Sequence, residues 1–177
     1  MRKPADEQLW SWVAEVSDPE IPVLSITDLG IVRAIDWQDD GCEVTITPTY
    51  SGCPAMQVIE DNIKAALQRH GVHAAVRTVL SPAWTTDWIS DSGRSKLKAY
   101  GIAPPAAKAP GTLQSVSESV AQSVNISALF ARRDDQVDCP QCGSTNTRLV
   151  SQFGSTACKA LYRCSDCLEP FDYFKPH

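Results

Sequence analysis

Five of the seven cysteines of this 177-residue chain lie within 29 consecutive residues near its carboxyl end. Four of them form two CxxC pairs, Cys139–Cys142 and Cys164–Cys167, which are separated by 21 residues. Two thiolates on one tight turn can reach a single ion, and two such turns complete a closed tetrahedral shell around zinc. A segment of about 40 residues buries too little apolar surface to fold unaided, so the metal would also supply folding energy. The pattern predicts a small zinc-ribbon-like domain over residues 137–177.

Two features of this domain stay open from the residues alone. Cys158 is the fifth thiol, and Cys139, Cys142, Cys158 and either Cys164 or Cys167 form an alternative set of ligands. Zinc and an iron–sulfur cluster both accept four thiolates. Zinc is the prediction, because closed sites built from two such turns are its commoner use. A redox-active CxxC pair is the competing hypothesis, but one redox motif would not call for a second pair.

Charge and hydropathy limit the partners and the location of the chain. Lys and Arg number 16 against 21 Asp and Glu, which gives a formal net charge of −5, so no broad positive field attracts nucleic acid or an anionic membrane. No apolar run opens the chain as in a signal peptide, and none approaches the length of about 18 residues that spans a bilayer. We therefore expect a cytoplasmic protein with reduced thiols and with neither a nucleic-acid nor a membrane partner.

The first 105 residues have the apolar spacings of a small α+β domain. These spacings predict helices over 4–16, 54–70 and part of 84–100, and strands over 31–37, 42–49 and 72–80. A QDDG turn joins the first two strands into a hairpin. The order of elements predicts a small mixed sheet with helices packed on one face. Over 18–30, two prolines exclude a regular helix and leave a structured loop rich in acids.

The composition of the chain changes after residue 105. Residues 106–136 are rich in Ala, Ser, Gln and Pro, which is typical of a linker. The predicted organisation is therefore a domain over 1–105, a linker over 106–136 and a cysteine-rich domain over 137–177.

Cys53 is an isolated cysteine between a predicted strand and a predicted helix, in the segment TYSGCP. With Pro54 at the first helical position, the thiol would lie at the positive end of the helix, which lowers a thiol pKa and stabilises a thiolate or a thiolate-bound metal. Gly52 would leave room beside the sulfur, and Thr49 and Ser51 offer hydroxyl donors. From position alone, a functional thiol and a buried structural cysteine are equally supported.

Other candidate residues favour structural roles. Trp84 and Trp88 are four residues apart and are predicted to share a helix face and to pack in the core. Cys42 is predicted to be a small buried hydrophobe. Three acids of the loop over 18–30 offer carboxylates for metal binding or, as the nearby turns favour, for capping: Asp18, Glu20 and Asp28.

Four segments in a fixed order carry a family resemblance: DPEIPVLSITDLG, TPTYSGCPA, PAWTTDW and FGSTACKALYRC. Together they resemble the PaaD family, accessory proteins of bacterial phenylacetate degradation, over residues 8–105 and 137–177. That family belongs to the wider iron–sulfur assembly domain family, which includes SufT-like proteins, and carries a zinc-ribbon-like tail. In such families the cysteine of the SGCP segment is the functional thiol, which would make Cys53 the residue that binds iron or an iron–sulfur cluster.

The resemblance implies a role in support of phenylacetyl-CoA epoxidase, a multicomponent oxygenase. The chain would not itself be catalytic; it would help to assemble a cluster in the reductase component, or to deliver one to it. The implied cofactors are zinc in the tail and transient iron or a cluster at Cys53, and the implied partners are the epoxidase components, with a homodimer also allowed. The alternative is a structural or electron-transfer subunit. Oxygen activation would then lie elsewhere, because no Glu-x-x-His pattern of a di-iron site is present.

Overall fold

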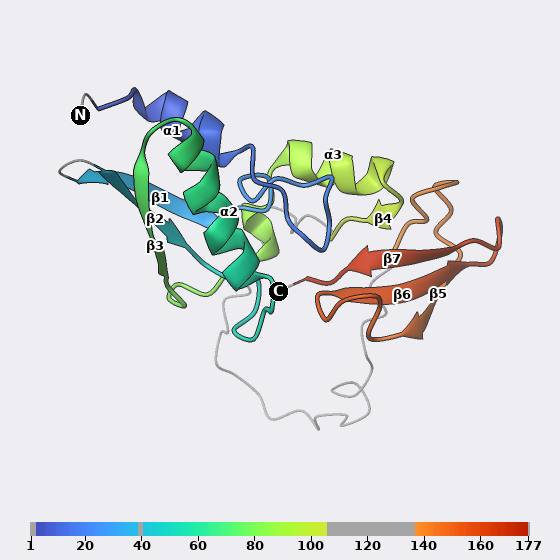
Figure 1. Cartoon of the computed structure of the whole chain (residues 1–177). Helices are drawn as coiled ribbons and strands as arrows, with labels where there is room; N and C mark the ends of the chain where they lie inside the picture. Colours follow the sequence, from blue (N-terminus) through green and yellow to red (C-terminus); the bar gives the residue numbers. More distant parts are fainter. Residues whose placement is uncertain (1–2, 39–40, 106–136, 177) are drawn as a thin grey trace, which may run out of the picture.

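The computed structural model describes residues 3–38, 41–105 and 137–176, which build two small sheets with helices beside the first (Figure 1). We call residues 3–105 the first part and residues 137–176 the tail. The predicted linker over 106–136 lies outside the described residues. Within the described residues, no helix has the length and apolar character needed to cross a membrane.

The first sheet has three strands, paired in chain order: β1 (Val32–Gln38), β2 (Gly41–Ile46) and β3 (His73–Thr78). β1 and β2 are antiparallel and form the predicted hairpin, whereas β3 runs parallel to β2. A parallel connection requires a crossover, and α2 (Met56–Arg69) supplies it. α2 and α1 (Asp6–Val13) cover one face of this sheet (Figure 1). The α+β class and the one-sided packing of helices are therefore confirmed.

Apolar periodicity explains the core of the first part. In α2, apolar residues three and four apart form one buried stripe of Ile59, Ile63, Ala66 and Leu67. In β2, alternate residues are buried on one face: Cys42, Val44 and Ile46. Each large aliphatic side chain buried in this way contributes about 1.5–3 kcal/mol. Cys42 is a buried hydrophobe, as predicted.

The segment after β3 contains two short helices in place of the single one expected over 84–100. These are η1 (Thr86–Trp88) and α3 (Asp91–Ala99). The side chains of Thr85 and Ser90 each accept a backbone N–H, so each starts its own helix. Trp84 lies before η1, so the prediction that Trp84 and Trp88 share a helix face is wrong. Its packing role is confirmed, because Trp84 is buried and its Nε1 donates to the Leu29 carbonyl at 2.9 Å.

The second sheet combines the tail with a short strand of the first part. Its order is β4–β7–β6–β5, and its strands are β4 (Ile102–Ala103), β5 (Thr147–Ser151), β6 (Lys159–Cys164) and β7 (Pro170–Phe174). Gly101, with φ of +90°, ends α3 and turns the chain into β4. β4 then runs parallel to β7, with Ile102 opposite Asp172 and Ala103 opposite Tyr173. Residues placed by sequence in the first domain thus complete the sheet of the tail.

The tail also contributes side chains to the core of the first part. Cys158 and Phe174 are 5% and 1% exposed and belong to the same buried cluster as Leu29 and Trp84. The rings of Trp84 and Phe174 have centroids 6.0 Å apart. The tail is therefore docked on the first part through apolar packing as well as through β4.

Candidate metal centres

Four cysteine sulfurs of the tail come together at one end of the second sheet. Cys139, Cys142, Cys164 and Cys167 place their sulfurs within 4.8 Å of one another, and we call them the four-thiol cluster. The Cys139–Cys167 and Cys142–Cys164 sulfur pairs are 3.7 and 3.6 Å apart. Sulfurs that surround a zinc ion tetrahedrally at 2.3 Å would be about 3.8 Å apart. The four donors therefore fit zinc in a closed site.

Backbone geometry holds the two CxxC turns in matching shapes. The residue after each second cysteine has a positive φ, +74° at Gly143 and +66° at Leu168. In the second turn, the backbone N–H of Cys167 donates to the Cys164 sulfur at 3.5 Å. This N–H donor contributes most to lowering the pKa of Cys164 to about 7. The turn thus favours the thiolate form of Cys164. In the same turn, the backbone N–H of Glu169 favours the Cys167 thiolate, but burial and the neighbouring thiols outweigh it and raise the pKa of Cys167 to about 12.

Cys158 does not lie in the four-thiol cluster. Its side chain points into the core of the first part, and its sulfur lies 3.8 Å from Oε2 of Glu20. The alternative ligand set that includes Cys158 therefore does not assemble in this structure. Sequence spacing could not decide between the two sets of ligands. Cys158 lies just before the start of β6, whereas Cys164 lies at its end, so the strand itself holds the two thiols apart.

Cys53 lies in the loop that leads from β2 to α2 and is half-buried. α2 begins at Met56, so the prediction that Pro54 is its first residue is wrong; Pro54 and Ala55 form a turn before the helix. The backbone N–H of Cys53 donates to the Tyr50 carbonyl at 3.1 Å and closes the turn ahead of it. Cys53 therefore lies between two consecutive turns, one that ends at Cys53 and one that leads into α2.

The pKa of Cys53 is raised, not lowered as predicted. Burial is the largest cause, and the carboxylates of Glu20 and Asp18 add to it. Hydrogen bonds from the backbone of Ala55 and the side chain of Thr49 favour the thiolate and oppose this rise. The predicted donors are therefore present in part, but burial and negative charge outweigh them. Cys53 is a protonated thiol at neutral pH unless a cation takes the place of its proton.

The acidic loop beside Cys53 is organised by its own carboxylates. Asp18 is 7% exposed, and its Oδ1 accepts the backbone N–H groups of Glu20 at 2.9 Å and Ile21 at 2.8 Å. Asp28 accepts from Ser25 and forms an ion pair with Lys96 at 2.6 Å. The capping roles predicted for these two acids are confirmed. The carboxylate of Glu20 is instead directed at the Cys158 sulfur.

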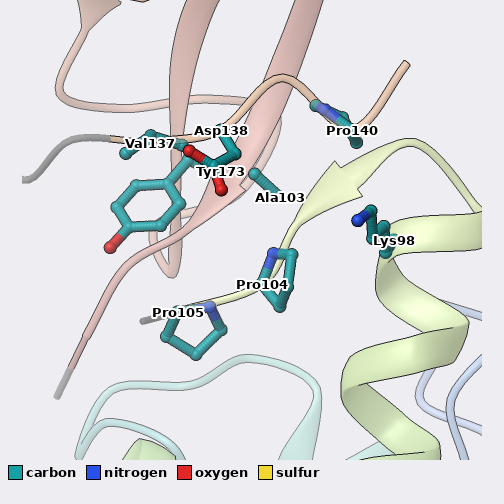
Figure 2. A pocket seen from close by; sticks show the side chains of 8 residues that line it. All are labelled: Lys98, Ala103, Pro104, Pro105, Val137, Asp138, Pro140 and Tyr173. Atoms are coloured by element: carbon teal, nitrogen blue, oxygen red, sulfur yellow. The ribbon is translucent and has the colours of Figure 1, made fainter. Parts of the chain in front are cut away.

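A separate hollow lies between α3, β4 and the start of the tail, with a volume of about 200 Å³ (Figure 2). Its lining contains one lysine and one acid among mainly apolar residues: Lys98, Ala103, Pro104, Pro105, Val137, Asp138, Pro140 and Tyr173. No thiol or imidazole lines it, so it lacks the soft ligands of the two cysteine regions.

Comparison with known families divides the chain in the same way as the thiols do. Residues 6–82 match the family described as iron-sulfur cluster assembly protein, and residues 126–175 match the PaaD zinc beta ribbon domain. The fold and the four-thiol cluster thus define an iron–sulfur assembly domain joined to a zinc ribbon.

One relative that matches nearly the whole chain defines its family more closely. An Escherichia coli (strain K12) protein, which is named as a subunit of 1,2-phenylacetyl-CoA epoxidase, is 43% identical over 173 residues, which cover 97% of this chain and 93% of that protein. The chain belongs to this family, the PaaD proteins.

Two further relatives match about half of this chain. The Fe-S protein maturation auxiliary factor YitW of Bacillus subtilis (strain 168) is 34% identical over 93 residues, which cover 51% of this chain and 90% of that protein. The Fe-S protein maturation auxiliary factor SufT of Staphylococcus aureus (strain USA300) is 37% identical over 78 residues, which cover 42% of this chain and 88% of that protein. About half of this chain is therefore similar to nearly the whole length of these two maturation factors.

Proposed function

We propose that this chain is a cytoplasmic accessory factor that helps to assemble or deliver an iron–sulfur cluster for phenylacetyl-CoA epoxidase, in its reductase component. One observation carries the proposal. Cys53 is a half-buried thiol whose pKa is raised by burial and by the charges of Glu20 and Asp18, in a domain of the iron–sulfur assembly family. A set of four cysteines that fits zinc lies elsewhere in the same chain. The names of the relatives support both the cluster chemistry and the epoxidase as client.

Cys53 is proposed to bind iron or a cluster as cargo. Because burial raises the pKa of this thiol, a bound cation must displace a proton, and a returning proton favours release. A thiol with a raised pKa would therefore bind iron or a cluster reversibly and not hold it permanently. Transfer therefore needs no bond-making catalysis by the chain itself.

The four-thiol cluster is proposed to hold zinc permanently. Four thiolates close the tetrahedral shell and leave no position for water or substrate, so this ion is structural. Zinc would fix the two CxxC turns and with them the sheet formed by β4 to β7. That sheet offers the surface by which the chain would recognise its client.

A second candidate function is that of a structural or electron-transfer component of the epoxidase. The naming of the Escherichia coli relative as part of that enzyme favours it. A component of this kind would purify with the epoxidase in a constant ratio, whereas an assembly factor would be absent from the mature, active complex.

The test compares two matched cysteine variants, Cys53→Ala and Cys42→Ala, in cells that express the epoxidase. Cys42 is buried near the opposite end of β2 from the Cys53 loop and serves as the control. We expect Cys53→Ala to lower iron and acid-labile sulfide in the purified reductase, with zinc in this chain unchanged, and Cys42→Ala to lower neither. A reductase with full cluster content alongside Cys53→Ala would contradict the proposal.

A further inference from the structure

Two arginines face each other across β5 and β6 in the tail. Arg148 lies directly opposite Arg163 in the antiparallel register of the two strands, and both residues are exposed. Like charges placed directly opposite each other destabilise a sheet. Among the residues that the structure describes, neither guanidinium forms an ion pair with a carboxylate. The pair is therefore a cost to the free chain, and an acidic partner would remove that cost.

Two acids of the tail are engaged elsewhere and do not neutralise this pair. Asp166 accepts a hydrogen bond from Asn146 at 2.8 Å, and Asp172 forms an ion pair with the buried Lys159 at 3.5 Å. The Nε of Arg163 donates to a carbonyl of the turn after β6 at 3.2 Å, which orients its guanidinium. The two terminal nitrogens of that guanidinium, which bind a carboxylate as a fork, have no hydrogen bond to any described residue.

Apolar side chains are exposed along the same strand and just after it. Val150 lies two residues after Arg148 and is 51% exposed, and Phe153, which follows β5, is 69% exposed. The Nζ of Lys175 lies 4.7 Å from the Phe153 ring centroid and donates to the Gln152 carbonyl at 3.2 Å. A cation thus holds this ring at the surface. Arginine and aromatic side chains are enriched in protein interfaces and supply much of their binding energy.

The position of β5 decides which groups are offered to a partner. β5 is the outermost strand of the second sheet (Figure 1). Its pairing with β6 is irregular between Leu149 and Ser151, and a bulge at an edge disfavours the addition of another strand. The contacts are therefore offered by side chains and not by the backbone. We call this surface the edge patch: Arg148, Val150, Phe153 and Arg163.

We propose that the edge patch binds an acidic segment of the client protein that also carries apolar side chains. Carboxylates of that segment accept hydrogen bonds from the two guanidiniums, and its apolar side chains cover Val150 and Phe153. A long phosphate backbone fits this surface less well, because the chain carries a net charge of −5 and the positive charge is local. The choice of client rests on the proposed function, and recognition at the tail is separate from cargo binding at Cys53.

The experiment measures the affinity of the full, zinc-loaded chain for the purified reductase component of the epoxidase. Arg148→Glu should weaken binding at least about tenfold, as truncation of a central interface arginine does. Lys64→Glu makes the same change of charge at an exposed position of α2 and should match wild type. The affinity of wild type should fall as the salt concentration rises, and that dependence should be weaker in Arg148→Gln.

Three outcomes would overturn the edge patch or its partner. Equal affinities of wild type and Arg148→Glu would show that the patch does not bind the client. Binding of a DNA duplex by wild type that is lost in Arg148→Glu would replace the acidic protein segment with nucleic acid. If Arg148→Glu loses its zinc, Phe153→Ser replaces it and should also bind at least about tenfold more weakly. An unchanged affinity in that variant would overturn the patch as well.

Cys53→Ala separates this inference from the function on which it rests. That variant should bind the reductase as tightly as wild type and yet leave it short of iron and sulfide. Full cluster content alongside Cys53→Ala would overturn the proposed function, whereas weaker binding by Arg148→Glu would still support the edge patch. A wild-type chain that does not bind the reductase would overturn both.

Discussion

The two cysteine regions of this molecule differ in how their sulfurs are arranged, although both contain thiols with raised pKa values. The four-thiol cluster has its sulfurs assembled within 4.8 Å, and a backbone N–H favours the thiolate at Cys164. Cys53 belongs to no such cluster among the described residues, and burial and the carboxylates of Glu20 and Asp18 raise the pKa of its thiol. The first arrangement suits an ion that stays, and the second suits one that arrives and leaves. Under the proposed function, one chain would hold one metal ion permanently and transfer another.

The largest expected effect comes from breaking the closed site. Cys164→Ala, or removal of zinc with a chelator, should unfold the tail, because structural zinc supplies about 10–16 kcal/mol in zinc-finger peptides. Hydrogen exchange should show amide protection lost in β5 to β7 and retained in β1 to β3. Cys42→Ala should leave both sets protected. Amides of the tail that stay protected from exchange without metal would show that the four-thiol cluster does not depend on a structural ion.

Loosening the contact between the two parts should expose Cys158 and leave the four-thiol cluster intact. Phe174→Ala removes a side chain that is 1% exposed and packs beside Trp84, and should lower the free energy of unfolding by about 3–5 kcal/mol. Denaturant titration measures this loss. Alkylation of Cys158 under native conditions should become faster, while zinc content should not change. Slow alkylation in a destabilised variant would mean that Phe174 does not hold the tail in place.

The pH dependence of metal binding should distinguish the Cys53 region directly. Burial raises the pKa of the Cys53 thiol, so this thiol is protonated at neutral pH and must lose its proton to bind an ion. Affinity for cobalt(II) should therefore rise with pH from about 6 to about 8, by about tenfold per pH unit for each proton released. Cobalt titrations of zinc-loaded protein at fixed ionic strength measure this slope. An affinity independent of pH would show that no thiol proton is displaced.

The smallest expected effect concerns the two turns of the four-thiol cluster. Leu168 has a φ of +66° and a side chain that is 60% exposed, so Leu168→Gly should remove backbone strain of about 1 kcal/mol with little loss of packing. Gly143→Ala should cost a similar amount, because φ there is +74° although nothing lies within 4 Å of an added Cβ. Thermal melts of the zinc-loaded protein would report shifts of opposite sign. Equal signs would show that φ does not control the stability of these turns.

Apolar spacing in the sequence was enough to predict the hairpin, α2 and β3, because each element buries one periodic stripe. Cysteine spacing likewise predicted the four thiols that assemble in the tail. Local patterns did not predict the split between η1 and α3, because two capping side chains decide where those helices begin. The sign of the Cys53 pKa shift also depended on tertiary structure. Burial and the carboxylates of a distant loop outweigh the helix-end donors that the local sequence supplies.

The position of Cys158 depends on tertiary structure in the same way. Spacing grouped it with the other tail cysteines, although its sulfur faces Glu20 in the first part. No local pattern encodes that contact, because it depends on how the second sheet docks through β4 and Phe174. The FGSTACK segment contains Cys158 directly before Lys159. Both residues are buried in the fold.

The pairing of β4 with β7 has a consequence for where the two described parts meet. Pro105 and Val137 are 32 positions apart in the sequence but line the same hollow (Figure 2). The tail is therefore held in place by its own contacts with the first part, through β4 and Phe174, and not by the covalent connection alone.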